Sequence, residues 1–339
     1  MEKSTIVAGV TTENTTKSGN NVHDAEGKFT SKDSSFEFSD KLEDDINFDE
    51  NEFNNIKDLD IDSLLFDENE FENIQNQDID TLLGVKKQLK DIEEMTTDEL
   101  IKELKGYQSF LKEQGVKVVG FKGLFGGDLK LKCSNLRQMK KMIEQYKIEL
   151  NGCTMKMTDA TGYVGRCWGN GASFNFIKGK FEVKYTSDLF FSKFYLFDYK
   201  SAKKSHEEDE KTNFCNVADD KFKTCYAMTH ELGHALHNTM FADYCNNSEK
   251  NNLNHDNFHD IRKQFVKDFK QDVYKQYILD NDPISYEDFE EKNSRYGKNY
   301  GVFEWFAEMF ASANCGKPTD VAKSFMKVLQ QKGYVKGGM

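Results

Sequence analysis

The chain has 339 residues and a formal net charge of −12, and 37% of its residues are hydrophobic. This length allows one or two globular domains, each with a hydrophobic core. No run of about eighteen apolar residues occurs, which excludes a transmembrane helix. The acidic balance argues against a protein that binds nucleic acid by neutralising phosphates over its whole surface. The N-terminus lacks the apolar run of a secretory signal, so we expect the protein in the cytoplasm of the producing cell.

The seven cysteines are an odd number, with wide spacings and no CxxC pair. These features do not support a zinc ribbon, and they leave at least one thiol outside any disulfide framework. We therefore expect free, mostly buried thiols in a reducing compartment.

The acidic side chains are concentrated in residues 1–90, which hold 22 acidic and 9 basic side chains, whereas residues 91–339 hold 36 and 37. The net charges of the two parts are therefore −13 and +1. The first part is also rich in Asn, Ser and Thr, a composition that buries too little apolar surface to offset the loss of chain entropy. We expect residues 1–90 to be disordered.

A repeat with a period of eighteen residues lies inside this acidic region. Phe48–Phe53 recurs as Phe66–Phe71, and Asp60–Leu65 recurs as Asp78–Leu83. Two copies are too few for a stacked solenoid. Acidic residues punctuated by Phe, Ile and Leu are typical of short segments that order on a partner. The repeat at 48–83 is thus a candidate docking segment or internal inhibitor, and a solubilising spacer without a partner is the alternative.

Residues 91–150 are expected to form a small helical connector. Thr97 precedes an amphipathic stretch with Asp and Glu in its first turn, which favours a helix. A basic stretch punctuated by glycine follows, from Gly115 to Gly127. Ser134 is then the expected N-cap of a second helix.

Residues 151–339 are expected to form the functional domain, of the α+β class. Lys180–Tyr185 alternates polar and apolar residues, the period of a half-buried strand, and Phe190–Phe197 is a second candidate strand. The first strand could pair with an extended substrate by strand addition. Farther along, Ile261–Ile278 has a helical pattern that could shape the substrate cleft.

The strongest functional signal is His230-Glu-Leu-Gly-His234. Two histidines four residues apart lie on one face of a helix, so both imidazoles can bind one tetrahedral Zn²⁺. Glu231 lies near the same face and can take a proton from the attacking water. No proline precedes Pro283, which agrees with a helix here.

A catalytic zinc usually has three protein ligands and a water, so a third ligand is needed. Met240 stands where a metzincin has its third histidine, which excludes that class. His237 lies near the same helix face, but one helix offers only two adjacent positions to a tetrahedral metal. We therefore expect His237 to support a ligand or to pack at the surface.

Glu304 and Glu308 are better candidates, because they stand four residues apart in the otherwise apolar stretch 302–311. Acidic residues at this spacing usually mark a solvated face. Here the apolar neighbours predict burial, and two buried carboxylates without partners would be strongly unfavourable or would shift their pKa values. A Zn²⁺ bound by one carboxylate, with the other fixing a histidine, removes this cost.

The remaining histidines are weaker candidates for a metal site. His255 and His259 also stand four residues apart, but Asp follows the first and the surroundings are rich in Asn, so we expect a surface pair. His23 and His206 lie among polar and charged residues and are expected to be solvated.

The HExxH sequence followed by Glu304-Trp-Phe-Ala-Glu308-Met-Phe resembles the gluzincin metallopeptidases of the anthrax lethal factor type, and related domains occur in proteins associated with phage heads. The resemblance covers about half of the chain. It implies a zincin-like fold, in which a small sheet packs on the HExxH helix and a second helix brings the glutamate. It also implies one Zn²⁺ per chain, with Glu304 as a ligand beside the two histidines and Glu308 as its support.

The family also has a tyrosine seven residues before the ligating glutamate, where it stabilises the tetrahedral oxyanion. Gly297 occupies that position in this chain, with Tyr296 beside it and Tyr300 closer to the glutamate. We take Tyr296 as the candidate oxyanion donor, and Tyr300 is the alternative.

The motifs and the resemblance together predict a zinc-dependent endopeptidase that acts on a protein or peptide substrate. His230, His234 and Glu304 would hold the metal. Glu231 would act as general base and then as acid toward the leaving amine. The alternative is a catalytically silent, zinc-stabilised structural or binding protein, such as a phage virion component. An intact Glu231 argues against it, and the resemblance leaves packaging in a virion open as a location.

Overall fold

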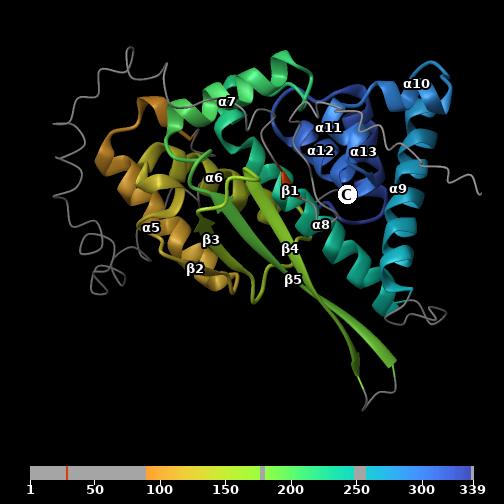
Figure 1. Cartoon of the computed structure of the whole chain (residues 1–339), viewed down its shortest axis with the longest axis horizontal. Coiled ribbons are helices and arrows are strands. Elements are labelled where there is room, and N and C mark those ends of the chain that lie inside the picture. Colours follow the sequence, from red (N-terminus) through yellow and green to blue (C-terminus); the bar gives the residue numbers. More distant parts are fainter. Residues whose placement is uncertain (1–27, 30–88, 176–179, 248–256, 337–339) are drawn as a thin grey trace, which may run out of the picture.

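The computed structural model describes residues 28–29, 89–175, 180–247 and 257–336 (Figure 1). The strands are β1 (Lys28–Phe29), β2 (Lys117–Val119), β3 (Thr154–Thr158), β4 (Gly165–Asn175) and β5 (Lys180–Ser192). The α-helices are α5 (Thr97–Glu113), α6 (Leu129–Gln145), α7 (Tyr199–Lys211), α8 (Tyr226–Asn247), α9 (Phe258–Asp280), α10 (Tyr286–Glu291), α11 (Arg295–Asn299), α12 (Val302–Asn314) and α13 (Asp320–Gln331). Short 3₁₀ helices lie at η2 (Ile92–Glu94), η3 (Leu124–Gly127) and η4 (Asp220–Cys225). The chain is therefore α+β and mostly helical, which confirms the predicted class.

A small mixed sheet has the strand order β1-β4-β5-β3-β2. β4 pairs antiparallel with β1 and β5, whereas β3 runs parallel to β5 and β2. The register of the β4–β5 hairpin shifts between Asn170 and Ala172, and the far end of the hairpin extends beyond the helices (Figure 1).

The predicted strand Lys180–Tyr185 is the first part of β5, an inner strand of the sheet. One edge of β5 pairs with β4. On its other edge, the side chain of Asn246 accepts from the N–H of Val183 at 3.2 Å and donates to its carbonyl at 2.9 Å. Both edges of the strand are therefore engaged at Val183, and strand addition of a substrate to β5 stays a prediction. The second predicted strand, Phe190–Phe197, is wrong beyond Ser192, where β5 ends.

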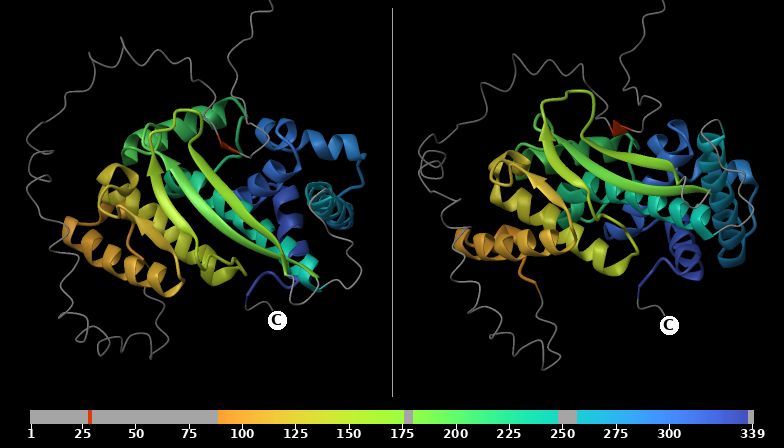
Figure 2. Two further views of the ribbon diagram at one scale, coloured as in Figure 1. Left: turned by 60° about the horizontal axis from the view of Figure 1, so that its bottom comes forward. Right: turned by 90° about the horizontal axis from the view of Figure 1, so that it is seen from below.

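Helices α8 and α12 form the centre of the molecule. The first four turns of α8 are almost entirely buried, because the sheet covers one side and α6, α9 and α12 pack on the others. The middle of α12, residues 304–312, is buried as its apolar sequence predicts. Figure 2 shows α6 and α8 along one face of the sheet, with α9 to α13 gathered at one end.

Residues 91–150 supply two helices and an edge strand of the sheet. Thr96 caps α5 through a reciprocal capping box. α6 begins earlier than predicted, with Asp128 as its N-cap, and the predicted cap Ser134 lies inside the helix, where its hydroxyl shares a 2.7 Å hydrogen bond with Thr224. β2 pairs with β3, and the hydrophobic core is continuous across residue 150.

The structure confirms the predicted helix and the predicted free cysteines, whereas the acidic repeat falls outside the described residues. The helical pattern at Ile261–Ile278 lies within α9, and all seven cysteines are free and buried, as predicted. The repeat at 48–83 and most of the region 1–90 lie outside the described residues. In the ranges described above, no helix is both long enough and apolar enough to cross a bilayer.

Candidate metal centre

The two histidines of the HExxH sequence and Glu304 converge where α8 packs on α12. Nε2 of His230 lies 3.1 Å from Oε2 of Glu304, and Nε2 of His234 lies 3.2 Å from the same oxygen. The three candidate ligand atoms lie within 4.8 Å of one another, and all three residues are buried. The four-residue spacing on the helix places the two imidazoles side by side, with ring centres 4.9 Å apart.

Gly233 allows α8 and α12 to approach closely enough for this convergence. A Cβ at Gly233 would lie 2.8 Å from Cα of Ala307 and 3.1 Å from Cβ of Phe310. A side chain at position 233 would therefore push the helices apart. Glu304 lies one turn before Ala307, so it would move away from the histidines.

The donor set fits a divalent metal ion. Two imidazole nitrogens and one carboxylate oxygen form a ligand set found in catalytic zinc sites, with the fourth position left to a water or substrate. The site also attracts positive charge, because hydrogen bonds to Glu304 and Glu308 raise the pKa of His230 to about 10, although burial opposes the charge. Burial lowers the pKa of His234. These residues could therefore hold a metal ion.

Glu308 supports the far side of His230. Oε1 of Glu308 lies 3.1 Å from Nδ1 of His230. Its Oε2 accepts hydrogen bonds from Oγ of Ser294 at 2.8 Å, the hydroxyl of Tyr226 at 3.2 Å and Nδ2 of Asn216 at 3.3 Å. A carboxylate accepts, so Nδ1 of His230 carries the proton and Nε2 is left for a metal. Glu308 thus contacts the nitrogen of His230 that faces away from Glu304.

His234 has a different partner on its far nitrogen. Its Nδ1 lies 3.1 Å from Nε2 of His237, whose ring stacks on Phe303 with centres 5.3 Å apart. Nη2 of Arg262 lies 3.5 Å from Nδ1 of His237 and donates to Asn238 at 2.6 Å. Burial and the charge of Arg262 hold the pKa of His237 well below its usual value. His237 is fully buried beside the candidate ligand His234, so the surface alternative is wrong.

Glu231 follows His230 in α8, close enough to feel the charges of His230 and Glu304, and is fully buried. Within the described part of the chain, neither of its oxygens makes a hydrogen bond of normal geometry. A Cβ at Gly165, the first residue of β4, would lie 2.8 Å from Cγ and Oε1 of Glu231, so the strand backbone packs directly on the carboxylate. Burial raises the pKa of Glu231 to about 8; the charge of His230 opposes this shift and the charge of Glu304 adds to it.

Tyr296 lies against the same cluster. It is fully buried, and its ring centre lies 5.6 Å from that of His230. Burial, with the negative charges of Glu304 and Glu231, raises its pKa well above the usual value. Tyr300 is half-buried and stacks on Tyr296 with ring centres 4.9 Å apart. Tyr296 is thus in contact with a candidate ligand.

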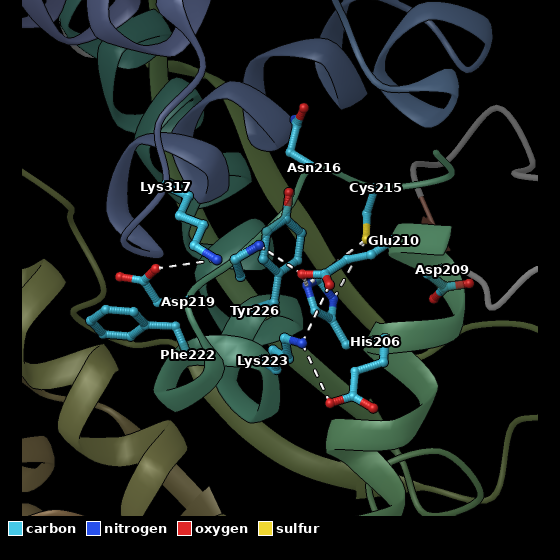
Figure 3. A network of polar contacts seen from close by, with 12 residues as sticks. His206, Asp209, Glu210, Cys215, Asn216, Asp219, Phe222, Lys223, Tyr226 and Lys317 are labelled. Atoms are coloured by element: carbon cyan, nitrogen blue, oxygen red, sulfur yellow. Dashed lines mark hydrogen bonds and ion pairs between the residues drawn. The ribbon is translucent and has the colours of Figure 1, made fainter. Parts of the chain in front are cut away.

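A buried polar network surrounds His206, so the expectation that this residue is solvated is wrong (Figure 3). His206 stacks on Tyr226 with ring centres 4.4 Å apart, and its Nε2 lies 3.2 Å from Oε1 of Glu210. Sγ of Cys215 lies 3.5 Å from its Nδ1. Tyr226 also donates to Glu308, which joins this network to the metal centre. The spacing of His206 and Glu210 on one helix face is the sequence signal that could have indicated the pair.

Of the two remaining pairs of predicted histidines, only His259 and His206 lie among the described residues, and neither belongs to the group of candidate ligands. His259 is exposed, and His255 and His23 lie outside the described residues. In the part of the chain that the structure describes, the cluster of His230, His234 and Glu304 is the sole group of three such side chains able to hold a metal ion.

No protein-family model, curated protein or solved structure matches the chain. A function therefore has to be inferred from the chemistry of the site.

Proposed function

We propose that the chain is a zinc-dependent endopeptidase with a zincin-like fold of the gluzincin type. The observation that carries this proposal is the convergence of His230, His234 and Glu304, with the buried carboxylate of Glu231 beside them. Structural zinc sites usually have four protein ligands, whereas catalytic sites have three and keep a position open. A catalytically silent protein would also have no use for Glu231, because burying a carboxylate with so little hydrogen bonding is unfavourable.

The chemistry divides between the metal and the chain. Zn²⁺, when bound, supplies a Lewis acid that makes water more acidic and polarises the scissile carbonyl. Glu231 takes the proton of the attacking water and returns it to the leaving amine. Burial favours the protonated form of Glu231, the form that hands the proton on to the leaving amine.

Tyr296 is the proposed donor to the developing oxyanion. Its pKa lies well above the usual value, so the hydroxyl stays protonated and can donate. Glu308 and His237 do not touch the reacting atoms. They hold the rings of His230 and His234 through the far nitrogens.

The proposed substrate is an extended peptide that pairs with the outer edge of β4. β5 occupies the inner edge, and among the described residues β1 alone lies on the outer one. Paired strands lie about 4.8 Å apart. Because Gly165 packs on Glu231, a peptide on this edge lies one strand spacing from the backbone that contacts the base. The acidic repeat at 48–83 remains a proposed docking segment, and the cytoplasm or a phage virion the proposed location.

The Glu231→Gln variant tests the proposal. It should keep one bound Zn²⁺ per chain and lose hydrolysis of a peptide library by roughly 10²- to 10⁴-fold, since the general base is gone. Mass spectrometry of the library and metal analysis measure both. Glu287→Gln, the same change at an exposed position of α10, should behave as the wild type. Full activity in Glu231→Gln would contradict the mechanism. A wild type that binds zinc and hydrolyses nothing would favour the structural alternative.

A further inference from the structure

A short segment from the N-terminal part of the chain lies on the proposed substrate edge. β1 pairs antiparallel with the start of β4, with Lys28 opposite Arg166 and Phe29 opposite Gly165. Figure 1 shows β1 beside β4. The pairing is therefore made by residues far from the catalytic domain in sequence.

The register places this segment next to the catalytic base. Phe29 pairs with Gly165, the residue whose missing side chain gives room to the carboxylate of Glu231. Strand addition relies on backbone hydrogen bonds, and these do not depend on the identity of the side chains. The backbone of β1 therefore uses the same pairing groups of β4 that a substrate peptide would need.

The centre is also closed to a substrate in this arrangement. His230 and Glu231 are 0% exposed, Glu304 is 2% exposed and His234 is 4% exposed. β1 is held by two residue pairs, so its displacement breaks few hydrogen bonds.

We propose that Lys28–Phe29 is an internal competitor, a segment of this chain that occupies the peptide-binding edge of β4 until a substrate displaces it. This inference rests on the proposed function for its consequence in catalysis. A tethered segment competes as part of the same chain and is not diluted by the solution, which can compensate for a short pairing. Competition of this kind raises KM and leaves kcat unchanged.

Phe29→Pro in the full-length chain tests the competition. Proline removes the N–H of residue 29 and restricts its backbone, so the pairing with β4 should be lost. KM for library peptides should fall about fivefold, the factor expected for the loss of one net hydrogen bond, with kcat unchanged. Asn20→Pro, which introduces a proline outside β1, should leave both KM and kcat at the wild-type values. An unchanged KM in Phe29→Pro, or a change confined to kcat, would overturn the inference.

A binding measurement separates this inference from the proposed function. A fluorescent synthetic peptide with the sequence of residues 22–36 should bind the Phe29→Pro chain about fivefold more tightly than the wild type, because the edge is open. Fluorescence polarisation detects this without any hydrolysis. Equal binding to both chains would sink the inference even if the protein is a peptidase. Tighter binding would support it even if Glu231→Gln refuted the mechanism.

Discussion

The surroundings of His230 and His234 differ although both residues come from one helix and meet the same glutamate oxygen. The far nitrogen of His230 contacts the carboxylate of Glu308, which three further donors hold in place. The far nitrogen of His234 contacts the imidazole of His237, beside the cation of Arg262. The partner of His230 is therefore an anion, whereas the partner of His234 is a neutral imidazole with the cation of Arg262 next to it.

This difference shows how the protein can give two chemically identical ligands unequal strength. A carboxylate partner makes a ligating imidazole more basic and fixes its orientation. A neutral imidazole partner fixes the orientation with less gain in basicity, and the nearby charge of Arg262 works against further positive charge. We expect His230 to contribute more to metal affinity than His234.

Metal removal should expose the difference most strongly. In the chelated chain His230, whose pKa is raised to about 10, should stay protonated at pH 8, whereas His234, whose pKa is lowered, should be neutral. A raised pKa gives stability that is fully present below the unfolded value of about 6.5 and is lost as the pH rises through about 10. The loss should be on the order of 4 kcal/mol.

The NMR shifts of the imidazole nitrogens, followed against pH, measure the two protonation states. Chemical unfolding at pH 6.5 and pH 10.5 measures the loss of stability. Glu231, with its pKa raised to about 8, adds a loss in the same direction. Identical titration curves for His230 and His234 would contradict the proposed difference between the surroundings of the two histidines.

Removing the charge on the His230 side should have the next largest effect. Glu308→Gln keeps the shape of the side chain but replaces the anion with a neutral amide. Zinc affinity should fall roughly 10- to 100-fold, the usual cost of losing such a partner. Competition with a chelating dye measures it, with Glu287→Gln as the matched control at an exposed site. Wild-type affinity would mean that Glu308 serves packing alone.

Changing the His234 side should have the smallest effect. His237→Phe keeps a ring against Phe303 but removes the hydrogen bond to His234. Zinc affinity should fall about threefold to fivefold, the value of one neutral hydrogen bond. His237→Gln, which retains an acceptor, should lose less. A larger loss than that of Glu308→Gln would reverse the order of the two sides.

The sequence predicts the centre of the site well, because its information is local. The helical spacing of His230 and His234, and of Glu304 and Glu308, places each pair on one face, and the apolar neighbours of the glutamates predict their burial. Local spacing does not predict that the helices of the two pairs pack together. The resemblance implied this packing, and the close contact at Gly233 shows what makes it physically possible.

Features that depend on distant contacts could not be predicted. The sequence does not decide whether His237 supports a ligand or packs at the surface. The contacts that bury it come from Arg262 in α9 and Phe303 in α12, which are distant in sequence. His206 has polar neighbours in sequence, yet Tyr226 covers it in the fold. The pattern of β5 indicates a strand but does not predict which neighbours occupy its edges, so the contacts of Val183 with β4 and Asn246 could not be predicted.

The contact at Gly233 also bears on which ion the protein selects. Zinc bonds to nitrogen are about 2.0–2.1 Å long, whereas calcium bonds to oxygen are about 2.3–2.6 Å. A methyl group at position 233 would widen the space between Glu304 and the two imidazoles while leaving every ligand in the chain. The spacing of the three candidate ligand atoms thus depends on Gly233, which offers no electron pair, and a substitution there could change the preferred ion without altering a candidate ligand.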